Sequence, residues 1–566
     1  MQPIISFEQF NFQYKHAAQP TVKDITFHIY PGEKVLIAGR SGSGKSTLAH
    51  CINGLIPFSY EGTSTGTILI DGKDPRKGSI FEQSKRVGTI LQDQDAQFIG
   101  LTVEEDVAFY LENECVSQDD MKMIVSDSLK KVKMHSFHKQ SPHELSGGQK
   151  QTVSLAGLLT TNADILLFDE PLANLDPLSA LYTIELIKDI HKQYNKTIVI
   201  IEHRIEEMFN LDLDKIILMD EGEIVAIGTP EEILSSNILP SIGLREPMYI
   251  EVLKRLHFDS NNEVIYPLEN LQRESVSSVI NEWMEKQVFC KDTPTKKELL
   301  KIENLSFSYP NKQKVLNNVN FSIYEGEIVA LLGSNGAGKS TLAHSLIGIN
   351  KTKNDRILID GVNINSWSIR KRGEVISYVM QNPNHMITQA TVMEEVSFPL
   401  KLKKFSKEEI KLRAEETLKI CGLYPFRNWP IRALSYGQKK RVTIASVLTT
   451  NPKLIILDEP TAGQDYYHYK QFMTFIRKLA ARGISFIFIT HDMNLALEYA
   501  DRAIILHEGE IIANNTASIV LGHPETLQRA NLKESSLFKL VKFSGIANPE
   551  RFMKLYFDVM RREEGV

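Results

Sequence analysis

Residues 39–47 read GRSGSGKST, and this stretch decides the fold of the first half of the chain. It follows the apolar run 34-KVLIAG-39 and leads into 45-KSTLAHCINGL-55, an order that predicts a strand, a tight loop and a helix. Glycines allow the backbone of such a loop to wrap around an anion, and the helix N-terminus adds partial positive charge. We predict a phosphate-binding loop. The alternative is an ordinary glycine-rich turn that caps a helix.

The same pattern occurs again in the second half of the chain. There 333-GSNGAGKST-341 follows 328-IVALLG-333 and leads into 339-KSTLAHSLIGI-349. In each copy we expect the lysine to reach the β- and γ-phosphates of a nucleotide and the serine hydroxyl to ligate Mg²⁺. The predicted nucleotide-binding residues of the two loops are Gly39, Arg40, Ser41, Gly42, Ser43, Gly44, Lys45, Ser46, Thr47, Gly333, Ser334, Asn335, Gly336, Ala337, Gly338, Lys339, Ser340 and Thr341.

Three further motifs recur at matching intervals. The pairs are LSGGQ at 145–149 with LSYGQ at 434–438, ILLFDEP at 165–171 with LIILDEP at 454–460, and IIEH at 200–203 with FITH at 488–491. Gln92 to Ser146 and Gln381 to Ser435 are both intervals of 54 residues, and each serine precedes its motif aspartate by 23 residues. Such intervals indicate two copies of one fold.

The repeated apolar runs predict α/β architecture in each copy. ILLF, LIIL, TIVII and SFIFI read as buried parallel strands, and ligands of such sheets bind at the carboxyl ends of the strands. We expect a first domain at 1–235, a partly helical connector at 236–299, a second domain at 300–520 and a C-terminal extension at 521–566. Within the extension, 551-RFMKLYFDVMRR-562 predicts an amphipathic helix. We expect it to pack on its own domain, and binding to a partner is the alternative.

Acidic residues follow two of the predicted strands. Asp169 and Asp458 end apolar runs and are candidate Mg²⁺ ligands, directly or through water. Glu170 and Glu459 come next, and we assign each as the base that orients or deprotonates an attacking water. A lone Asp-Glu pair after a strand is usually only the start of a loop. The repetition behind two phosphate loops favours the catalytic interpretation.

His203 and His491 each follow another apolar run and are placed to contact a γ-phosphate. The alternative for each is a structural histidine. Ser146 and Ser435 stand where the N-caps of the helical stretches 149–159 and 438–448 would lie. Taken alone, each serine would indicate no more than an ordinary capped helix.

Together these motifs resemble those of ABC ATPases, over about 450 of the 566 residues. The resemblance implies two tandem P-loop NTPase domains, each with a RecA-like core and a helical subdomain that carries LSGGQ. In this family two such domains meet head to tail, and each ATP lies between the phosphate loop of one and the signature of the other. The N-terminus of the signature helix suits the second anion contact.

The resemblance assigns two composite sites. The first joins Lys45, Ser46, Gln92, Asp169, Glu170 and His203 with Ser435, Tyr436, Gly437 and Gln438. The second joins Lys339, Ser340, Gln381, Asp458, Glu459 and His491 with Ser146, Gly147, Gly148 and Gln149. The implied Mg²⁺ ligands are Ser46, Gln92, Asp169, Ser340, Gln381 and Asp458.

Other positions match the family in the surroundings of the nucleotide. Tyr14 and Tyr309, expected before the first strands, match the aromatic residue that stacks on adenine, and ordinary strand tyrosines are the alternative. Asp176 and Asp465 match the loop that crosses between halves. Tyr436 replaces a signature glycine, and 173-ANLD-176 differs from 462-AGQD-465, so we expect two sites of unequal rate, neither inactive.

A narrower resemblance points to the ATPases of energy-coupling-factor importers of vitamins or metal ions. It rests on 87-VGTILQDQDAQF-98, 102-TVEEDVAF-109, 142-PHELSGGQKQ-151 and 201-IEHRIEE-207. It implies a transmembrane coupling subunit, a small membrane substrate-binding subunit and a peripheral place on the cytoplasmic face of the membrane. The family relays signals to the membrane partner through Gln92 and Gln381.

Composition agrees with a soluble ATPase. The net charge of −5 gives no field that favours nucleic acid, and the four cysteines form no C-x-x-C pair and predict no disulfide. We find no signal peptide and no apolar stretch approaching the roughly 18–20 residues of a membrane helix. Other chains are therefore expected to form any membrane path.

Three other classes of ABC protein are alternatives. ABC-F translation factors also carry two domains, but their typical crossing loop is missing, and 202-EHR-204 replaces their usual histidine motif. Fused sugar-importer ATPases usually carry a weakened second phosphate loop, whereas 333-GSNGAGKST-341 is intact. DNA-repair ABC proteins would need a long coiled coil or zinc inserts.

Overall fold

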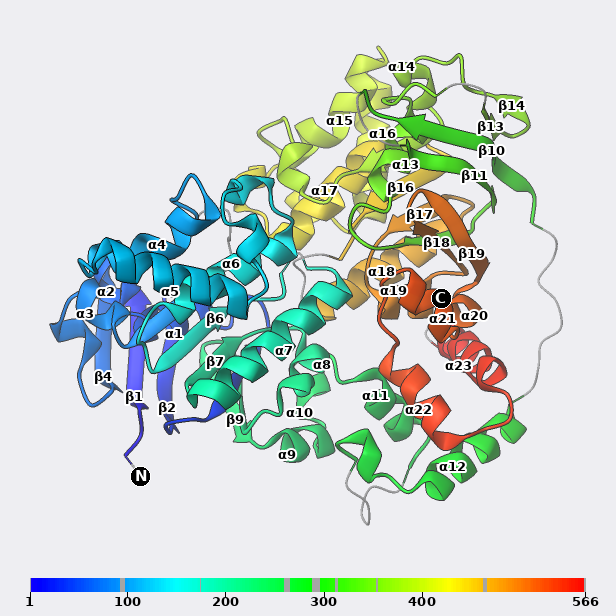
Figure 1. Cartoon of the computed structure of the whole chain (residues 1–566). Coiled ribbons are helices and arrows are strands. Elements are labelled where there is room, and N and C mark those ends of the chain that lie inside the picture. The colour runs from blue at the N-terminus through cyan, green and yellow to red at the C-terminus, as the bar shows by residue number, and fades with distance from the viewer. Residues whose placement is uncertain are drawn as a thin grey trace. The chain divides into compact units, whose positions relative to one another are not determined.

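The computed structural model of the chain describes residues 2–91, 97–173, 175–258, 265–287, 296–310, 314–352, 355–461 and 466–563. The chain divides into two compact units, Met1–Gln272 and Arg273–Val566. Figure 1 shows that each unit combines sheets with covering helices. The predicted α/β architecture is confirmed.

A six-stranded sheet forms the centre of each unit. Its order is β5-β6-β7-β3-β8-β9 in the first unit and β15-β16-β17-β12-β18-β19 in the second, and only the last strand of each is antiparallel to its neighbour. The strands of the first unit are β3 (Lys34–Gly39), β5 (Val87–Ile90), β6 (Ile165–Asp169), β7 (Thr197–Ile201), β8 (Lys215–Asp220) and β9 (Glu223–Gly228). Those of the second are β12 (Ile328–Leu332), β15 (Ile376–Val379), β16 (Leu454–Asp458), β17 (Ser485–Ile489), β18 (Arg502–His507) and β19 (Glu510–Thr516).

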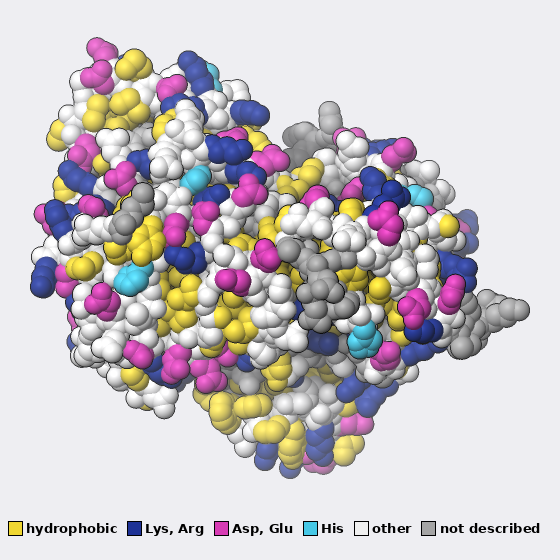
Figure 2. Space-filling model, turned by 90° about the horizontal axis from the view of Figure 1, so that it is seen from below, with side chains coloured by type: hydrophobic (Ala, Val, Ile, Leu, Met, Phe, Trp, Pro, Cys, Tyr) yellow, Lys and Arg dark blue, Asp and Glu magenta, His cyan; other side chains and the backbone are white. Residues whose placement is uncertain are grey.

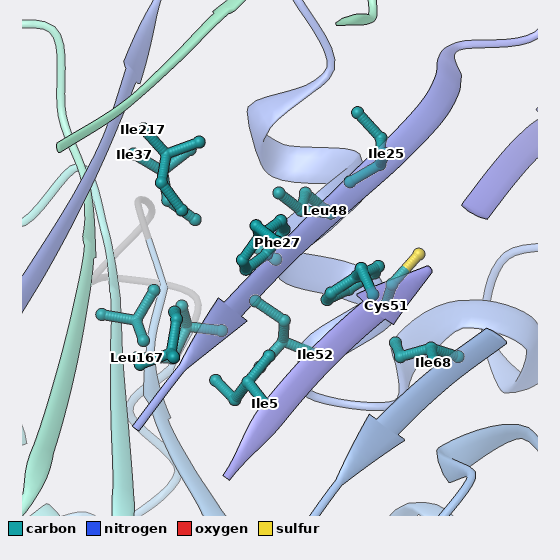
Figure 3. Close-up of a cluster of buried hydrophobic side chains, with 14 of the residues drawn as sticks. Ile5, Ile25, Phe27, Ile37, Leu48, Cys51, Ile52, Ile68, Leu167 and Ile217 are labelled. Atoms are coloured by element: carbon teal, nitrogen blue, oxygen red, sulfur yellow. The ribbon is translucent and has the colours of Figure 1, made fainter. Parts of the chain in front are cut away.

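A smaller antiparallel sheet accompanies each central sheet. The first consists of β1 (Ile5–Tyr14), β2 (Val22–Ile29) and β4 (Gly62–Ile70). The second consists of β10 (Glu298–Ser308), β11 (Lys314–Tyr324), β13 (Arg356–Ile359) and β14 (Val362–Asn363). In the first unit, apolar side chains from both sheets meet around helix α1 (Lys45–Ile52), and Figure 3 shows Ile5, Phe27, Leu48 and Leu167 in this core. The helix that begins at the phosphate loop is thereby fixed by burial.

Three helices in each unit form a separate helical subdomain. They are α4 (Val103–Asn113), α5 (Gln118–Lys131) and α6 (Gly147–Leu159) in the first unit, and α15 (Val392–Leu402), α16 (Lys407–Ile420) and α17 (Tyr436–Leu448) in the second. The second subdomain has its own apolar cluster, which includes Val396, Leu418 and Val442. Packing among these helices holds the start of α6 or α17 in place.

The remaining helices cover the sheets or belong to the connector and tail. In the first unit they are α2 (Leu55–Phe58), α3 (Ile80–Ser84), α7 (Pro177–Tyr194), α8 (Ile205–Met208), α9 (Pro230–Ser235), α10 (Ile238–Ser241) and α11 (Met248–Arg255). In the second unit they are α12 (Arg273–Lys286), α13 (Lys339–Ile347), α14 (Ile369–Arg372), α18 (Tyr466–Ala480), α19 (Met493–Tyr499), α20 (Ala517–Val520), α21 (Pro524–Arg529), α22 (Ser536–Ser544) and α23 (Pro549–Glu563).

The two phosphate-loop helices are shorter than the sequence predicts. The expected helix 45–55 ends at Ile52, and α2 begins after Gly54, whose φ is +80°. The expected helix 339–349 ends at Ile347, because Gly348 adopts a left-handed conformation with φ of +85°. A left-handed glycine is a common helix terminator, since it satisfies the last carbonyls with backward N–H bonds.

The tail helix α23 packs within its own unit, as expected. Its side chains Phe552 and Tyr556 are buried, and Trp283 of α12 meets the Phe552 ring edge-on at 5.7 Å between centroids. Helices α12, α22 and α23 are in mutual contact (Figure 1). The amphipathic face of the tail is therefore part of the second unit's interior.

We predict that Phe552→Ala destabilises the second unit. Phe552 is 0% exposed, and truncating a buried phenylalanine costs about 3–5 kcal/mol of unfolding free energy through lost burial and a residual cavity. Denaturant titration followed by circular dichroism would measure the change. Leu412→Ala, at an exposed position of α16, is the control and should change stability by less than about 0.5 kcal/mol. Equal stability of the two variants would contradict the packing of α23.

Candidate functional site

The first phosphate loop curves around its own lysine. Lys45 is 6% exposed, and its Nζ donates to the carbonyls of Gly39 at 2.8 Å and Arg40 at 2.7 Å. Gly44 has a φ of +96°, and a Cβ at Gly39 would come within 2.2 Å of the Met219 carbonyl oxygen. Both positions therefore require glycine, one for conformation and one for space.

The second phosphate loop has the same geometry. Lys339 Nζ donates to the carbonyls of Gly333 at 2.7 Å and Ser334 at 2.9 Å. Gly338 has a φ of +104°, and a Cβ at Gly333 would come within 2.3 Å of the Leu506 carbonyl oxygen. Each loop thus presents an ammonium group at the N-terminus of a buried helix, an arrangement suited to phosphate. The remaining predicted residues of both stretches lie in these turns or in the first turn of the helix that follows.

The two predicted adenine-stacking tyrosines adjoin the phosphate-loop helices. The hydroxyls of Tyr14 and Thr47 are 3.1 Å apart, and those of Tyr309 and Thr341 are 3.5 Å apart. The expectation that these tyrosines precede the first strands is wrong, because Tyr14 ends β1 and Tyr309 follows β10. Both rings are partly exposed beside the loops, where a base could stack.

Asp169 lies at the carboxyl end of β6, next to Ile201 at the end of β7. It is 6% exposed, and its Oδ1 has no hydrogen-bond partner among the described residues. Burial and the neighbouring Glu170 raise the pKa of Asp169 to about 6, while Lys45 acts in the opposite direction. A buried carboxylate oxygen without a partner fits a magnesium ligand, since a cation would supply the missing compensation.

The equivalent Asp458 has a partner. The Tyr378 hydroxyl, on β15, donates to Asp458 Oδ2 at 2.5 Å. Burial raises the pKa of Asp458, and the hydrogen bond from Tyr378 opposes that shift. Thr89 occupies the register position of Tyr378 in the first unit, opposite Leu167, just as Tyr378 lies opposite Ile456. The two aspartates therefore differ in their surroundings.

Each catalytic candidate glutamate adopts an unusual backbone conformation and meets a histidine. Glu170 and Glu459 have φ values of +48° and +43°, and their N–H groups donate to Ile201 and Ile489 of the neighbouring strand. Both glutamates thus have a left-handed backbone conformation at the same place in their units. Such strained conformations cluster at functional sites.

The histidine contacts are unequal. His491 Nδ1 lies 2.8 Å from Glu459 Oε1, whereas His203 Nδ1 lies 3.7 Å from Glu170 Oε1 and 3.3 Å from Glu202 Oε1. Burial alone would lower the pKa of His203, but the nearby carboxylates of Glu170 and Glu202 raise it above its usual value. The structure thus places each candidate histidine near the candidate catalytic glutamate of its own unit; contact with the γ-phosphate stays a prediction.

Three buried residues beside these glutamates, Glu202, Thr490 and Lys440, were not predicted as part of either site. Glu202 is 0% exposed and accepts hydrogen bonds from the N–H groups of His203 at 2.8 Å and Arg204 at 3.1 Å. Its counterpart is Thr490, whose hydroxyl donates to Glu459 Oε2 at 3.3 Å. The contrast between IIEH and FITH is the sequence signal that could have shown this difference.

Lys440 is the third residue that the motifs did not identify. It is 2% exposed, and its Nζ donates to the carbonyls of Glu459 at 3.0 Å and Pro460 at 2.9 Å. Burial lowers the pKa of Lys440 to about 8, and the charges of Glu459 and Asp458 act against that change. The first unit has the neutral Gln151 at this position.

The signature serines are N-caps, as predicted. Ser146 and Ser435 each form a capping box with the glutamine three residues later, Gln149 or Gln438. Gly147, Gly148 and Gly437 lie in the first turns of α6 and α17. Tyr436 finds room by turning its hydroxyl to the carbonyl of Gln381 at 3.1 Å.

Not every predicted residue can be placed. Gln92 and Asp465 lie outside the described residues. Asp176 caps α7, accepting from the Ser179 N–H at 2.9 Å. Along the described parts of the chain, no helix combines the length and the apolar character needed to cross a membrane. Charged side chains of both signs are interspersed on the face shown in Figure 2.

Two models of protein families match parts of this chain. A family model described as ABC transporter matches residues 22–173 and 316–462. A second, described as ATP-binding cassette cobalt transporter, matches residues 236–307, which include the whole of the predicted connector 236–299.

Full-length relatives are described as ABC transporter ATP-binding proteins. One from Bacillus cereus (strain ATCC 10987 / NRS 248) is 93% identical over 566 residues and 100% of both chains. One from Clostridium perfringens is 49% identical and covers 99% of this chain and 98% of its own. One from Staphylococcus aureus strain MRSA252 is 46% identical and covers 99% of both.

Among solved structures, cbiO1 from Clostridium perfringens, described as part of the ABC transporter complex cbiONQ, is 36% identical, with a TM-score of 0.40. It covers 44% of this chain and 100% of that chain. The family model matches both units, and the relatives match from end to end. The chain therefore belongs to the ABC transporter ATP-binding proteins and carries two ABC ATPase domains in one polypeptide.

Proposed function

We propose that this ATPase energises an energy-coupling-factor-type importer of a vitamin or metal ion. Its ABC domains bind ATP, and membership of the family makes it the ATP-hydrolysing component of a transporter. The match of residues 236–307 to a cobalt transporter family supports the narrower assignment. The relatives reported above are all transporter proteins and give no support to a ribosome-bound ABC-F factor.

One observation carries the catalytic part of the proposal. In both units a glutamate with positive φ at the end of a strand meets a histidine from the next strand, in a domain that also carries a phosphate-loop lysine. Glu170 and Glu459 then orient or deprotonate the attacking water, and His203 and His491 contact the γ-phosphate. Positioning and charge stabilisation are the main requirements of phosphoryl transfer.

The lysines neutralise the transferred phosphate. Lys45 and Lys339 would exchange their present carbonyl partners for the β- and γ-phosphate oxygens. Mg²⁺ would be held by Ser46, Gln92 and Asp169 in one unit and by Ser340, Gln381 and Asp458 in the other. When bound, the ion supplies charge compensation to the phosphates.

We further propose that each nucleotide lies between the phosphate loop of one unit and the signature helix of the other. The capping boxes at Ser146 and Ser435 leave helix N-termini that suit a phosphate. ATP binding would close the two halves, and the repulsion between products would reopen them. The motion would pass to a transmembrane coupling subunit that works with a small membrane substrate-binding subunit, at the cytoplasmic face of the membrane.

Replacing both glutamates tests the catalytic assignment. We expect Glu170→Gln with Glu459→Gln to lower ATP turnover by at least about 100-fold, because the amide cannot accept a proton from water. ATP binding should persist, since the phosphate loops are intact. Phosphate release and fluorescent-nucleotide titration would measure the two properties.

The matched control is Lys45→Ala with Lys339→Ala, which should abolish nucleotide binding as well as turnover. Turnover of the glutamine variant within a few-fold of the parent would refute the assignment of Glu170 and Glu459 as bases.

The single variants test the inequality of the two sites. Glu459 is oriented by both His491 and Thr490, and its proposed site uses the unmodified signature LSGGQ. We therefore expect Glu459→Gln to remove a larger share of the steady-state ATPase rate than Glu170→Gln. Measured side by side at saturating ATP, equal losses, or a larger loss in Glu170→Gln, would argue against this ranking.

A further inference from the structure

The signature tyrosine of the second unit joins two segments that bind different nucleotides in the proposed composite sites. Tyr436 is the first residue of α17, directly after Ser435, which would contact the ATP held by the Lys45 loop. Its hydroxyl donates to the carbonyl of Gln381 at 3.1 Å, and Gln381 belongs to the site of the Lys339 loop. The side chain of Tyr436 therefore links the signature helix to the segment that contains Gln381.

We propose, resting on the composite sites proposed above, that Tyr436 is a positioning residue that couples the two ATP sites through its bond to Gln381. Movement of Gln381 when ATP fills the Lys339 site would then displace or fix the start of α17. Ser435 would follow, because it caps the same helix turn. Linkage makes the effect mutual, so ATP in either site would favour ATP in the other.

The surrounding contacts make this bond part of a connected frame. The Tyr436 ring lies 5.4 Å from the ammonium of Lys440, and that ammonium holds the carbonyls of Glu459 and Pro460. Tyr378 lies three residues before Gln381, and its hydroxyl donates to Asp458, the residue directly before Glu459. Helix α17 therefore contacts both segments. Tyr436 binds the segment that ends in Gln381, and Lys440 binds the segment that contains Glu459.

The first unit lacks the side chains that build this frame. Gly147 stands in place of Tyr436, Gln151 in place of Lys440, and Thr89 in place of Tyr378. A glycine offers no hydroxyl, so the first signature helix cannot form the equivalent side-chain bond. The proposed coupling is therefore specific to the signature of the second unit. It assigns a function to Tyr436, which stands where the first signature has a glycine.

Nucleotide binding to the full chain tests the coupling without interference from turnover. In the Glu170→Gln, Glu459→Gln background, titration with a fluorescent ATP analogue should show two sites with positive cooperativity. Adding Tyr436→Phe removes only the hydroxyl. We expect the coupling factor between the sites to fall about 5-fold, the lower end of ordinary allosteric couplings, with the Hill coefficient moving toward one.

Tyr424→Phe is the matched control, because its ring lies beside Arg427 and not beside Gln381. It should leave cooperativity unchanged, and thermal unfolding should show that both variants are folded. Tyr436→Gly, which copies the first unit, should reproduce the loss seen with Tyr436→Phe.

Cooperative binding that survives in both Tyr436 variants would overturn the coupling role and leave the composite sites standing. Two independent sites already in the background variant would overturn both proposals. Absence of a second bound nucleotide would contradict the proposed function itself.

Discussion

The parallel pairing of three strands fixes where the chemistry of each unit lies. β3 ends in the phosphate loop, β6 ends in the aspartate and glutamate, and β7 leads into the histidine, with register pairs that join β3 to β7 and β7 to β6. Parallel neighbours end on the same edge, so side chains from distant parts of the chain converge there. The same pairing holds β12, β17 and β16 in the second unit. Apolar burial of these strands and of the phosphate-loop helix keeps the edge in place.

The two copies share this frame but differ in buried charge. The first has a fully buried carboxylate, Glu202, beside its catalytic candidates, while the second has the ammonium of Lys440 beneath Glu459. A charge in a water-poor interior acts strongly on its neighbours, because screening is weak there. Together with Tyr436 and Tyr378, these differences give the halves distinct surroundings at otherwise equivalent positions. The two copies keep the frame but differ in its lining, which gives the proposed difference in rate between their sites a physical basis.

Much of the fold could be predicted from the sequence, because buried parallel strands are continuous apolar runs and their ends carry the motifs. The fold class, the family and the N-cap roles of Ser146 and Ser435 are confirmed. The roles of the site residues in ATP and Mg²⁺ binding stay predictions. Tyr378 and Lys440 could not be assigned from spacing, since their partners come from other segments and only the fold brings them together. Helix ends were missed where left-handed glycines decide them.

We propose that each ATP is held by a phosphate loop and by the signature of the other unit. The most direct measurement is a structure of the Glu170→Gln, Glu459→Gln protein with ATP and Mg²⁺. We expect two nucleotides, with Ser435 within hydrogen-bonding distance of the ATP on Lys45 and Ser146 within that distance of the ATP on Lys339. Two bound nucleotides, each contacted only by residues of its own unit, would contradict it.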